Sequence, residues 1–158
     1  MKKDDIYFMR LVLKEAKKAE KIGEIPIGAI VVKDGKVISR SFNKVEKKNS
    51  SLMHAEIDAL LKAQKKLRNW RLNGCTIYTN VEPCLMCTYA IILSRMNRVV
   101  FGCRNEKFGG IYSLVDIENL KLNHKIEITE GILKEESIKL LKDFFKNVRK
   151  KGEVVELV

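Results

Sequence analysis

The chain has 158 residues, the length of about one domain, and 46% of them are hydrophobic while 32% are charged. Two prolines and nine glycines are too few for a collagen-like or low-complexity chain, and the hydrophobic content excludes a disordered one. Lysine and arginine (31) outnumber the acidic residues (20), which leaves a net charge of +11. This excess favours a polyanionic partner, above all a nucleic acid, although a lysine-rich surface that serves only solubility would carry the same charge.

The N-terminal residues and the cysteine usage bear on the compartment. An amphipathic stretch follows the first five residues, so the layout is not that of a secretory signal, and the longest apolar stretch, residues 25–32, is too short to span a bilayer. Two of the four cysteines, Cys84 and Cys87, stand three apart, which is typical of a metal site in a reducing compartment rather than of a disulfide scaffold. We therefore expect a cytoplasmic protein.

Apolar periodicity predicts the elements of the first half. A helix can be capped by Asp4 or Asp5 and ended by Gly23, because the apolar residues between them recur every three or four positions. A strand hairpin is expected over residues 27–38, with its turn at Asp34-Gly35. After a polar segment, a second helix is predicted from His54 to about Leu67.

The second half alternates strands and helices. Strands are expected at residues 75–79, 99–101 and 126–128, and helices at residues 84–96 and 138–148. Pro83 suits the first position of its helix, because its missing N–H would have no partner there. The run from Cys75 to Phe101 is a crossover unit, which requires parallel pairing. We expect an α/β fold of three α/β/α layers, a mixed five-stranded sheet with helices on both faces, in one domain over residues 1–151 with a short tail at 152–158.

Three residues have the chemistry and spacing of metal ligands. Cys84 and Cys87 in the first turn of a helix would present both sulfurs on one face, and His54 at the start of another helix can supply a third ligand. No fourth ligand stands out, because Cys75, Cys103 and His124 fit structural roles better. Catalytic zinc sites hold three protein ligands and keep one position for water, so the pattern predicts one catalytic Zn²⁺ per chain.

Glu56 stands two residues from a predicted ligand and is the candidate general acid and base. A glutamate that only interacts with its helix dipole would look the same in sequence. Its coincidence with a three-ligand site favours the catalytic interpretation.

These motifs carry a resemblance to the bacterial tRNA-specific adenosine deaminases, within the zinc-dependent cytidine and deoxycytidylate deaminase superfamily. It extends from the first helix to about Lys151. The segments that carry it are Ile25-Pro26-Ile27-Gly28-Ala29, His54-Ala55-Glu56, Glu82-Pro83-Cys84-Leu85-Met86-Cys87, Ser94-Arg95, Arg98-Val99-Val100-Phe101-Gly102, Asn123-His124 and Glu130-Gly131-Ile132-Leu133.

The resemblance implies a cytidine deaminase-like fold, zinc on His54, Cys84 and Cys87, and proton transfer by Glu56. It also implies a homodimer that binds the anticodon stem-loop of a tRNA. The substrate-binding residues that it suggests are Asn43, Ala55, Pro83 and Asn105. The RNA-binding residues that we expect are Lys47 and Lys48, between Asn43 and His54, and Phe145 and Arg149 near the C-terminus, although helical spacing suits Phe144 and Phe145 equally well to the core.

Asn105 is a departure from the family, which has Arg-Asp after the corresponding strand. It either contacts the nucleotide sugar or only caps a loop. Thr88-Tyr89 and Ile111-Tyr112 also replace smaller residues and can reshape the pocket.

The function expected from the sequence is hydrolytic deamination of adenosine to inosine at the wobble position of a tRNA anticodon loop, because loop bases are extruded at low cost. A free guanine or cytosine deaminase shares the zinc signature and is the alternative. A non-catalytic RNA-binding partner subunit would have no use for Glu56.

Overall fold

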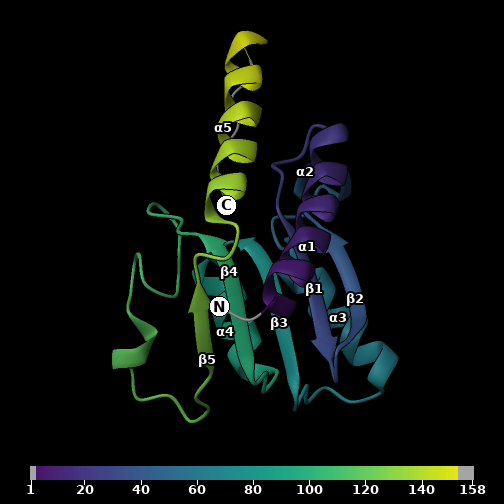
Figure 1. The fold of residues 1–158 in the computed structure, drawn as a ribbon, viewed down its shortest axis with the longest axis vertical. Helices are drawn as coiled ribbons and strands as arrows, with labels where there is room; N and C mark the ends of the chain where they lie inside the picture. The colour runs from purple at the N-terminus through teal and green to yellow at the C-terminus, as the bar shows by residue number, and fades with distance from the viewer. Residues whose placement is uncertain (1–2, 153–158) are drawn as a thin grey trace.

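The sheet is the middle of three layers in the computed structural model, which describes residues 3–152. Within these residues it has five strands, in the order β2-β1-β3-β4-β5 (Figure 1). Strand β1 pairs antiparallel with β2 and β3, whereas β3, β4 and β5 run parallel. The strands are β1 (Gly28–Lys33), β2 (Lys36–Phe42), β3 (Cys75–Val81), β4 (Arg98–Cys103) and β5 (Glu127–Glu130). The mixed five-stranded α/β fold predicted from the sequence is confirmed.

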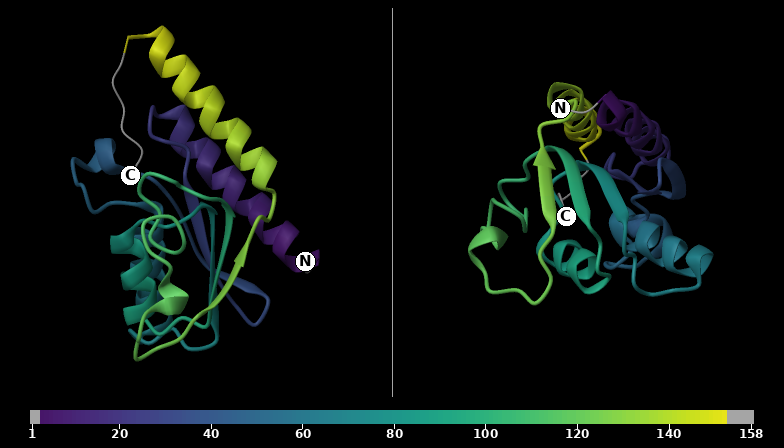
Figure 2. Two further views of the ribbon diagram at one scale, coloured as in Figure 1. Left: turned by 90° about the vertical axis from the view of Figure 1, so that its left-hand side faces the viewer. Right: turned by 60° about the horizontal axis from the view of Figure 1, so that its bottom comes forward.

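Helices cover both faces of the sheet (Figure 2). Helices α1 (Lys3–Lys21) and α5 (Lys134–Lys150) lie on one side, and α3 (Ala55–Leu67) and α4 (Leu85–Leu93) lie on the other. A one-turn helix α2 (Val45–Lys48) follows β2, and a 3₁₀ turn (Ile117–Asn119) interrupts the connection from β4 to β5. None of the helices within residues 3–152 has the length and apolar character needed to cross a membrane.

Alternating side chains of the strands divide the core into two clusters. In β1, Ala29 and Val31 belong to the larger cluster, and Ile30 and Val32 to the smaller one, which also holds Val12 of α1. This period of two is what a strand buried on both faces requires. Gly28 allows α1 to pack closely, since a Cβ there would lie 2.5 Å from the Val12 carbonyl oxygen.

The start of α4 differs from the sequence prediction. Cys84 has extended backbone angles and forms an isolated β-bridge with Gly109, so the helix begins at Leu85, with Cys84 as its N-cap. The prediction that Pro83 occupies the first helical position is therefore wrong. The helix also ends at Leu93 rather than at residue 96, because the chain turns there with Arg95 at a positive φ of 60°.

Two further segments are the polar one between β2 and α3 and the C-terminal tail. The polar segment that carries Lys47 and Lys48 forms the short helix α2, which the sequence analysis did not predict. Of the expected tail, residues 153–158 lie outside the described residues.

A buried ion pair fastens α1 to the sheet. Asp5 is 1% exposed, and its two carboxylate oxygens accept hydrogen bonds from the Arg98 guanidinium at 2.9 and 2.7 Å. The Tyr78 hydroxyl donates to the same carboxylate at 2.8 Å. Bidentate arginine pairs of this kind are among the stronger hydrogen bonds in proteins, so this contact fixes α1 against β3 and β4.

We predict that Arg98→Met lowers the free energy of unfolding by about 3 kcal/mol, because it removes two charge-assisted bonds from a buried carboxylate. Arg104→Met is the matched control, since Arg104 pairs with Glu130 through two equally short bonds at the surface. It should leave the unfolding free energy close to that of the wild type. Urea titrations of both variants measure this, and equal losses would contradict the assigned strength of the buried pair.

Candidate active site

The predicted metal ligands lie where two helices begin at one edge of the sheet. His54 is the N-cap residue of α3, and Cys84 is the N-cap residue of α4, which directly follows β3. Cys87 lies one turn into α4. Because β1 runs antiparallel to its neighbours, residues 25–27 before β1 and residues 43–44 after β2 reach the same edge as the end of β3. The fold therefore brings segments about 30 residues apart in the chain to one point.

The three ligand atoms converge. His54 Nδ1 lies 3.6 Å from Cys84 Sγ and 3.4 Å from Cys87 Sγ, and all three atoms are within 4.8 Å of one another. Tetrahedral zinc with ordinary bond lengths would place such a nitrogen and sulfur about 3.6 Å apart. Within residues 3–152, no fourth histidine, cysteine or carboxylate joins the group. The donor set and its spacing fit a zinc ion with one free coordination position.

The electrostatics favour a thiolate at Cys84. A hydrogen bond from Cys87, together with His54, lowers the pKa of Cys84 to about 4, whereas the same hydrogen bond and burial raise the pKa of Cys87. Burial alone would lower the pKa of His54, but the hydrogen bond with Cys84 and the nearby carboxylate of Glu56 raise it. A metal cation bound to His54, Cys84 and Cys87 would displace the protons that these side chains carry.

Glu56 points into the interior next to this group. It is only 4% exposed, and desolvation together with the charge of Cys84 raises its pKa to about 7, against the opposing effect of His54. A carboxyl group with this pKa can both accept and release a proton near neutral pH, which is what a general acid and base must do. The position is the one expected of a proton carrier.

A shallow recess, too small in this structure to hold a water molecule, lies beside the ligands and is lined by Ile27, Asn43, His54, Ala55 and Glu56. The structure thus brings two of the predicted substrate-binding residues, Asn43 and Ala55, next to Glu56. The Asn43 backbone N–H donates to the Ile27 carbonyl oxygen at 2.9 Å, which holds the residue at the rim of the sheet. At this recess Glu56, Asn43 and the predicted ligand His54 line one common surface.

Glu82 is a structural residue of the site that the sequence analysis did not single out. Its buried carboxylate accepts hydrogen bonds from the backbone N–H groups of Asn105, Ile111, Tyr112 and Ser113 and from the Ser113 hydroxyl. These bonds lower its pKa, although burial alone would raise it. They fasten the loop of residues 105–113 beside Cys84, and Gly109 is required there because a Cβ would lie 2.3 Å from the Glu82 carboxyl carbon. The feature of the sequence that could have indicated this role is an acidic residue directly after a buried strand.

Pro83 and Asn105 both take part in holding the loop of residues 105–113. The carbonyl oxygen of Pro83, itself buried, accepts a hydrogen bond from Gly110 at 2.7 Å. Asn105 is 3% exposed, and its side-chain oxygen accepts from the Phe108 N–H at 3.1 Å, while its side-chain nitrogen has no hydrogen-bond partner within the described residues. Its contacts are those of the loop-capping alternative, and a role toward the sugar stays a prediction.

Comparison with known proteins places this geometry in a family. The model of the MafB19-like deaminase family matches residues 2–149. The chain belongs to this deaminase family. A relative from Bacillus subtilis (strain 168), named tRNA-specific adenosine deaminase, is 43% identical over 152 residues, which cover 96% of this chain and 94% of the relative.

Solved structures of two kinds resemble this deaminase. One, from a study of A-to-I editing by tRNA:A34 deaminases at the wobble position of transfer RNA, has a TM-score of 0.83 and 37% identity, and the match covers 85% of this chain and 99% of that one. Another, described as a guanine deaminase from Nitrosomonas europaea, has a TM-score of 0.76 and 28% identity over 86% of this chain and 81% of that one.

The predicted RNA-binding residues lie on two helices of the deaminase. Lys47 and Lys48 are exposed on α2, four and five residues after Asn43. On α5, Arg149 is exposed near the end of the helix, whereas Phe145 is half-buried against the core and stacks edge-on with Phe144, with ring centroids 5.4 Å apart. Phe145 therefore has a packing role in this structure, and RNA contact by it stays a prediction.

Substitutions at Glu56 and Cys87 should separate the proton carrier from the ligand. We expect Glu56→Gln to keep about one metal ion per chain and the wild-type fold while losing turnover, because only the proton carrier is gone. Cys87→Ala should lose metal and soluble protein together, since metal affinity is coupled to folding. Metal analysis and circular dichroism of both variants test this. A Glu56→Gln variant that deaminates its substrate at the wild-type rate would exclude Glu56 from the mechanism.

Proposed function

We propose that this deaminase converts adenosine to inosine at the wobble position of a tRNA anticodon loop. The observation that carries the proposal is the buried Glu56 beside three converging ligand atoms and a recess, in a chain 43% identical to a tRNA-specific adenosine deaminase over 96% of its length. The net charge of +11 suits a phosphate-rich substrate.

His54 Nδ1 and the sulfurs of Cys84 and Cys87 would hold one Zn²⁺. Zinc in an open three-ligand site lowers the pKa of a bound water molecule and so supplies a nucleophile at neutral pH. The helix N-termini at His54 and Cys84 carry positive partial charge, which stabilises the thiolates and favours anionic groups at this point.

Glu56 would move the protons of the reaction. A water molecule adds to C6 of the adenine base, and Glu56 accepts its proton and passes it to N1. Glu56 then passes a second proton from the added hydroxyl to the amino group, the C6–N bond breaks, and ammonia leaves inosine behind. Its pKa of about 7 suits both directions of transfer.

Asn43, Ala55 and the neighbouring loop would receive the base. Asn43 has a donor and an acceptor that can pair with the edge of a purine, and Ala55 lines the same recess with only a methyl group. Asn105 lies in the loop of residues 105–113 that Glu82 anchors, and the Pro83 carbonyl oxygen accepts a hydrogen bond from Gly110 of the same loop. We propose that this loop borders the nucleotide. An extruded loop base is the substrate that such a narrow site can accept.

One assay distinguishes this function from the alternative that the guanine deaminase likeness suggests. The purified protein is incubated separately with an anticodon stem-loop that carries adenosine at the wobble position, with guanine and with cytosine, and the products are identified by mass spectrometry. We expect inosine in the stem-loop and no conversion of the free bases. Xanthine as the main product would replace the proposal with guanine deamination.

Lys47 and Lys48 should contribute to RNA binding, because they follow the segment that carries Asn43. We expect the double substitution to glutamate to weaken stem-loop binding and to reduce the slope of log Kd against log salt by about 1 per lysine. Lys65 and Lys66, near the far end of α3, are the control, and the same substitution there should change the slope less. Equal slopes for the wild type and the Lys47/Lys48 variant would leave these lysines with no part in RNA contact.

We also propose a cytoplasmic homodimer. All four cysteines are free, and thiolate ligands persist in a reducing compartment. On α4, Leu85, Tyr89 and Leu93 recur every four residues and are 48%, 53% and 50% exposed, so they form one apolar stripe along the helix. A stripe of this kind is what a second copy of the chain would cover.

Glutamates on this stripe should separate the subunits. We expect Tyr89→Glu with Leu93→Glu to elute with the mass of one chain in size-exclusion chromatography with light scattering, whereas the wild type elutes with the mass of two. Tyr7→Glu is the control, because Tyr7 is 59% exposed on α1, across the sheet from α4. A double variant that keeps the mass of two chains would exclude α4 from the interface.

A further inference from the structure

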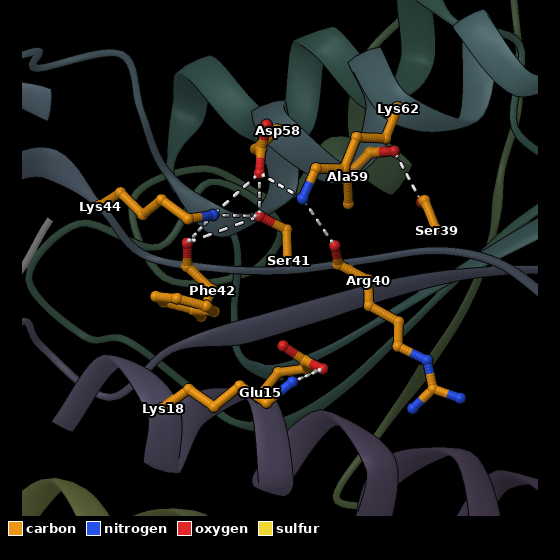
Figure 3. Close-up of polar contacts among 10 residues, drawn as sticks. All are labelled: Glu15, Lys18, Ser39, Arg40, Ser41, Phe42, Lys44, Asp58, Ala59 and Lys62. Atoms are coloured by element: carbon orange, nitrogen blue, oxygen red, sulfur yellow. Dashed lines mark hydrogen bonds and ion pairs between the residues drawn. The ribbon is translucent and has the colours of Figure 1, made fainter. Parts of the chain in front are cut away.

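Asp58 is an acidic residue of α3 whose carboxylate contacts one serine hydroxyl and two lysine ammonium groups. The proposed reaction does not use it. It lies one turn after His54, and its side chain is 17% exposed. Its Oδ2 atom accepts a hydrogen bond from the Ser41 hydroxyl and pairs with Lys44 Nζ at 3.0 Å and Lys62 Nζ at 3.1 Å (Figure 3). These partners lower the pKa of Asp58, although burial alone would raise it, so the carboxylate is charged at neutral pH.

Two of these partners stand on either side of Asn43. Ser41 is near the end of β2, and Lys44 is the N-cap residue of α2. The Lys44 ammonium also donates to the Phe42 carbonyl oxygen at 3.4 Å and lies 4.2 Å from the centre of the Phe42 ring. Figure 3 shows Ser41, Phe42 and Lys44 gathered below Asp58. The backbone before and after Asn43 is thus tied to one carboxylate of α3.

The Asn43 side chain itself has only long hydrogen bonds. Its Nδ2 lies 3.5 Å from the Ile25 carbonyl oxygen, and its Oδ1 accepts from the Val45 N–H at 3.4 Å, both near the outer limit for such bonds. A ligand can replace these contacts at small cost. The direction of the amide therefore depends on the backbone that carries it.

We propose that Asp58 is a positioning residue for Asn43. Through Ser41 and Lys44 it holds the segment of residues 41–44 against α3. This helix has His54 as its N-cap residue and carries Glu56. The group that binds the base and the group that moves the proton then keep one fixed spacing. The substrate side of this inference rests on the proposed function, in which Asn43 contacts the base.

Hydrogen exchange tests the structural step without any substrate. In Asp58→Asn, we expect the backbone amides of residues 41–48 to exchange about 10-fold faster than in the wild type, because a charge-assisted contact that closes this segment is lost. Lys44→Met removes the same link from the other side and should act alike. Lys62→Met is the matched control. Lys62 pairs with the same carboxylate but is 50% exposed, and its other hydrogen bond goes to the Arg40 carbonyl oxygen at 3.0 Å, outside the tested segment, so exchange of residues 41–48 should stay at the wild-type rate. Wild-type exchange in Asp58→Asn would overturn the proposal.

Kinetics test whether Asp58 acts through Asn43. On the adenosine stem-loop, with metal content matched, we expect Asp58→Asn to lower kcat/KM about 10- to 100-fold, as small misplacements of binding groups do. In an Asn43→Ala background the same substitution should change kcat/KM less than about twofold, because residues that act as one unit are not additive. Equal losses in both backgrounds would overturn the proposal. If the wild type does not deaminate the stem-loop at all, the proposed function fails, while the exchange experiment still decides whether Asp58 holds the segment.

Discussion

The contact of His54 Nδ1 with the two sulfurs of Cys84 and Cys87, at 3.6 and 3.4 Å, is the interaction on which the rest of the site depends. It exists because α3 and α4 begin at the same edge of the sheet, beside the end of β3. Ligands in open α/β sheets bind at the carboxyl ends of the strands for this reason. The helix N-termini add positive potential, which stabilises the thiolate form of the cysteines at this point.

Buried carboxylates hold the loops around this point. Glu82 collects four backbone N–H groups of the loop after β4, and Glu24 accepts from the Lys47 N–H at 2.8 Å in α2. Asp58 ties the end of β2 to α3. A buried carboxylate is costly unless donors surround it, so Glu82, with hydrogen bonds to both of its oxygens, selects the loop conformation that supplies these donors. Loops on both sides of the recess are therefore defined without regular secondary structure.

The strands and long helices were predictable because each buries a regular apolar pattern. The alternation in β1 and the three-and-four spacing in α1 are visible in the sequence and are satisfied in the structure. The grouping of His54, Cys84 and Cys87 was also predictable, because two cysteines at helical spacing and a histidine at a helix start have few other uses together. The start of α4 was not, since the extended conformation of Cys84 depends on its bridge to Gly109, 25 positions later.

The loop anchors could not be predicted for the same reason. Glu82 finds its partners 23 to 31 residues further along the chain, and Asp58 finds Ser41 17 residues earlier. A single acidic residue near a strand end or in a helix can suggest such a role but does not identify the partners. Only the order of strands and the common edge of the sheet bring them together.

The most direct test of this account is the coordination of the metal in the purified protein, measured by X-ray absorption at the zinc edge. The account requires one zinc per chain with two sulfur ligands at about 2.3 Å and two nitrogen or oxygen ligands at about 2.0 to 2.1 Å, one of them from water. Three or four sulfur ligands would show a closed structural site with no place for a substrate water. That result would contradict the proposal that Glu56 serves a catalytic centre.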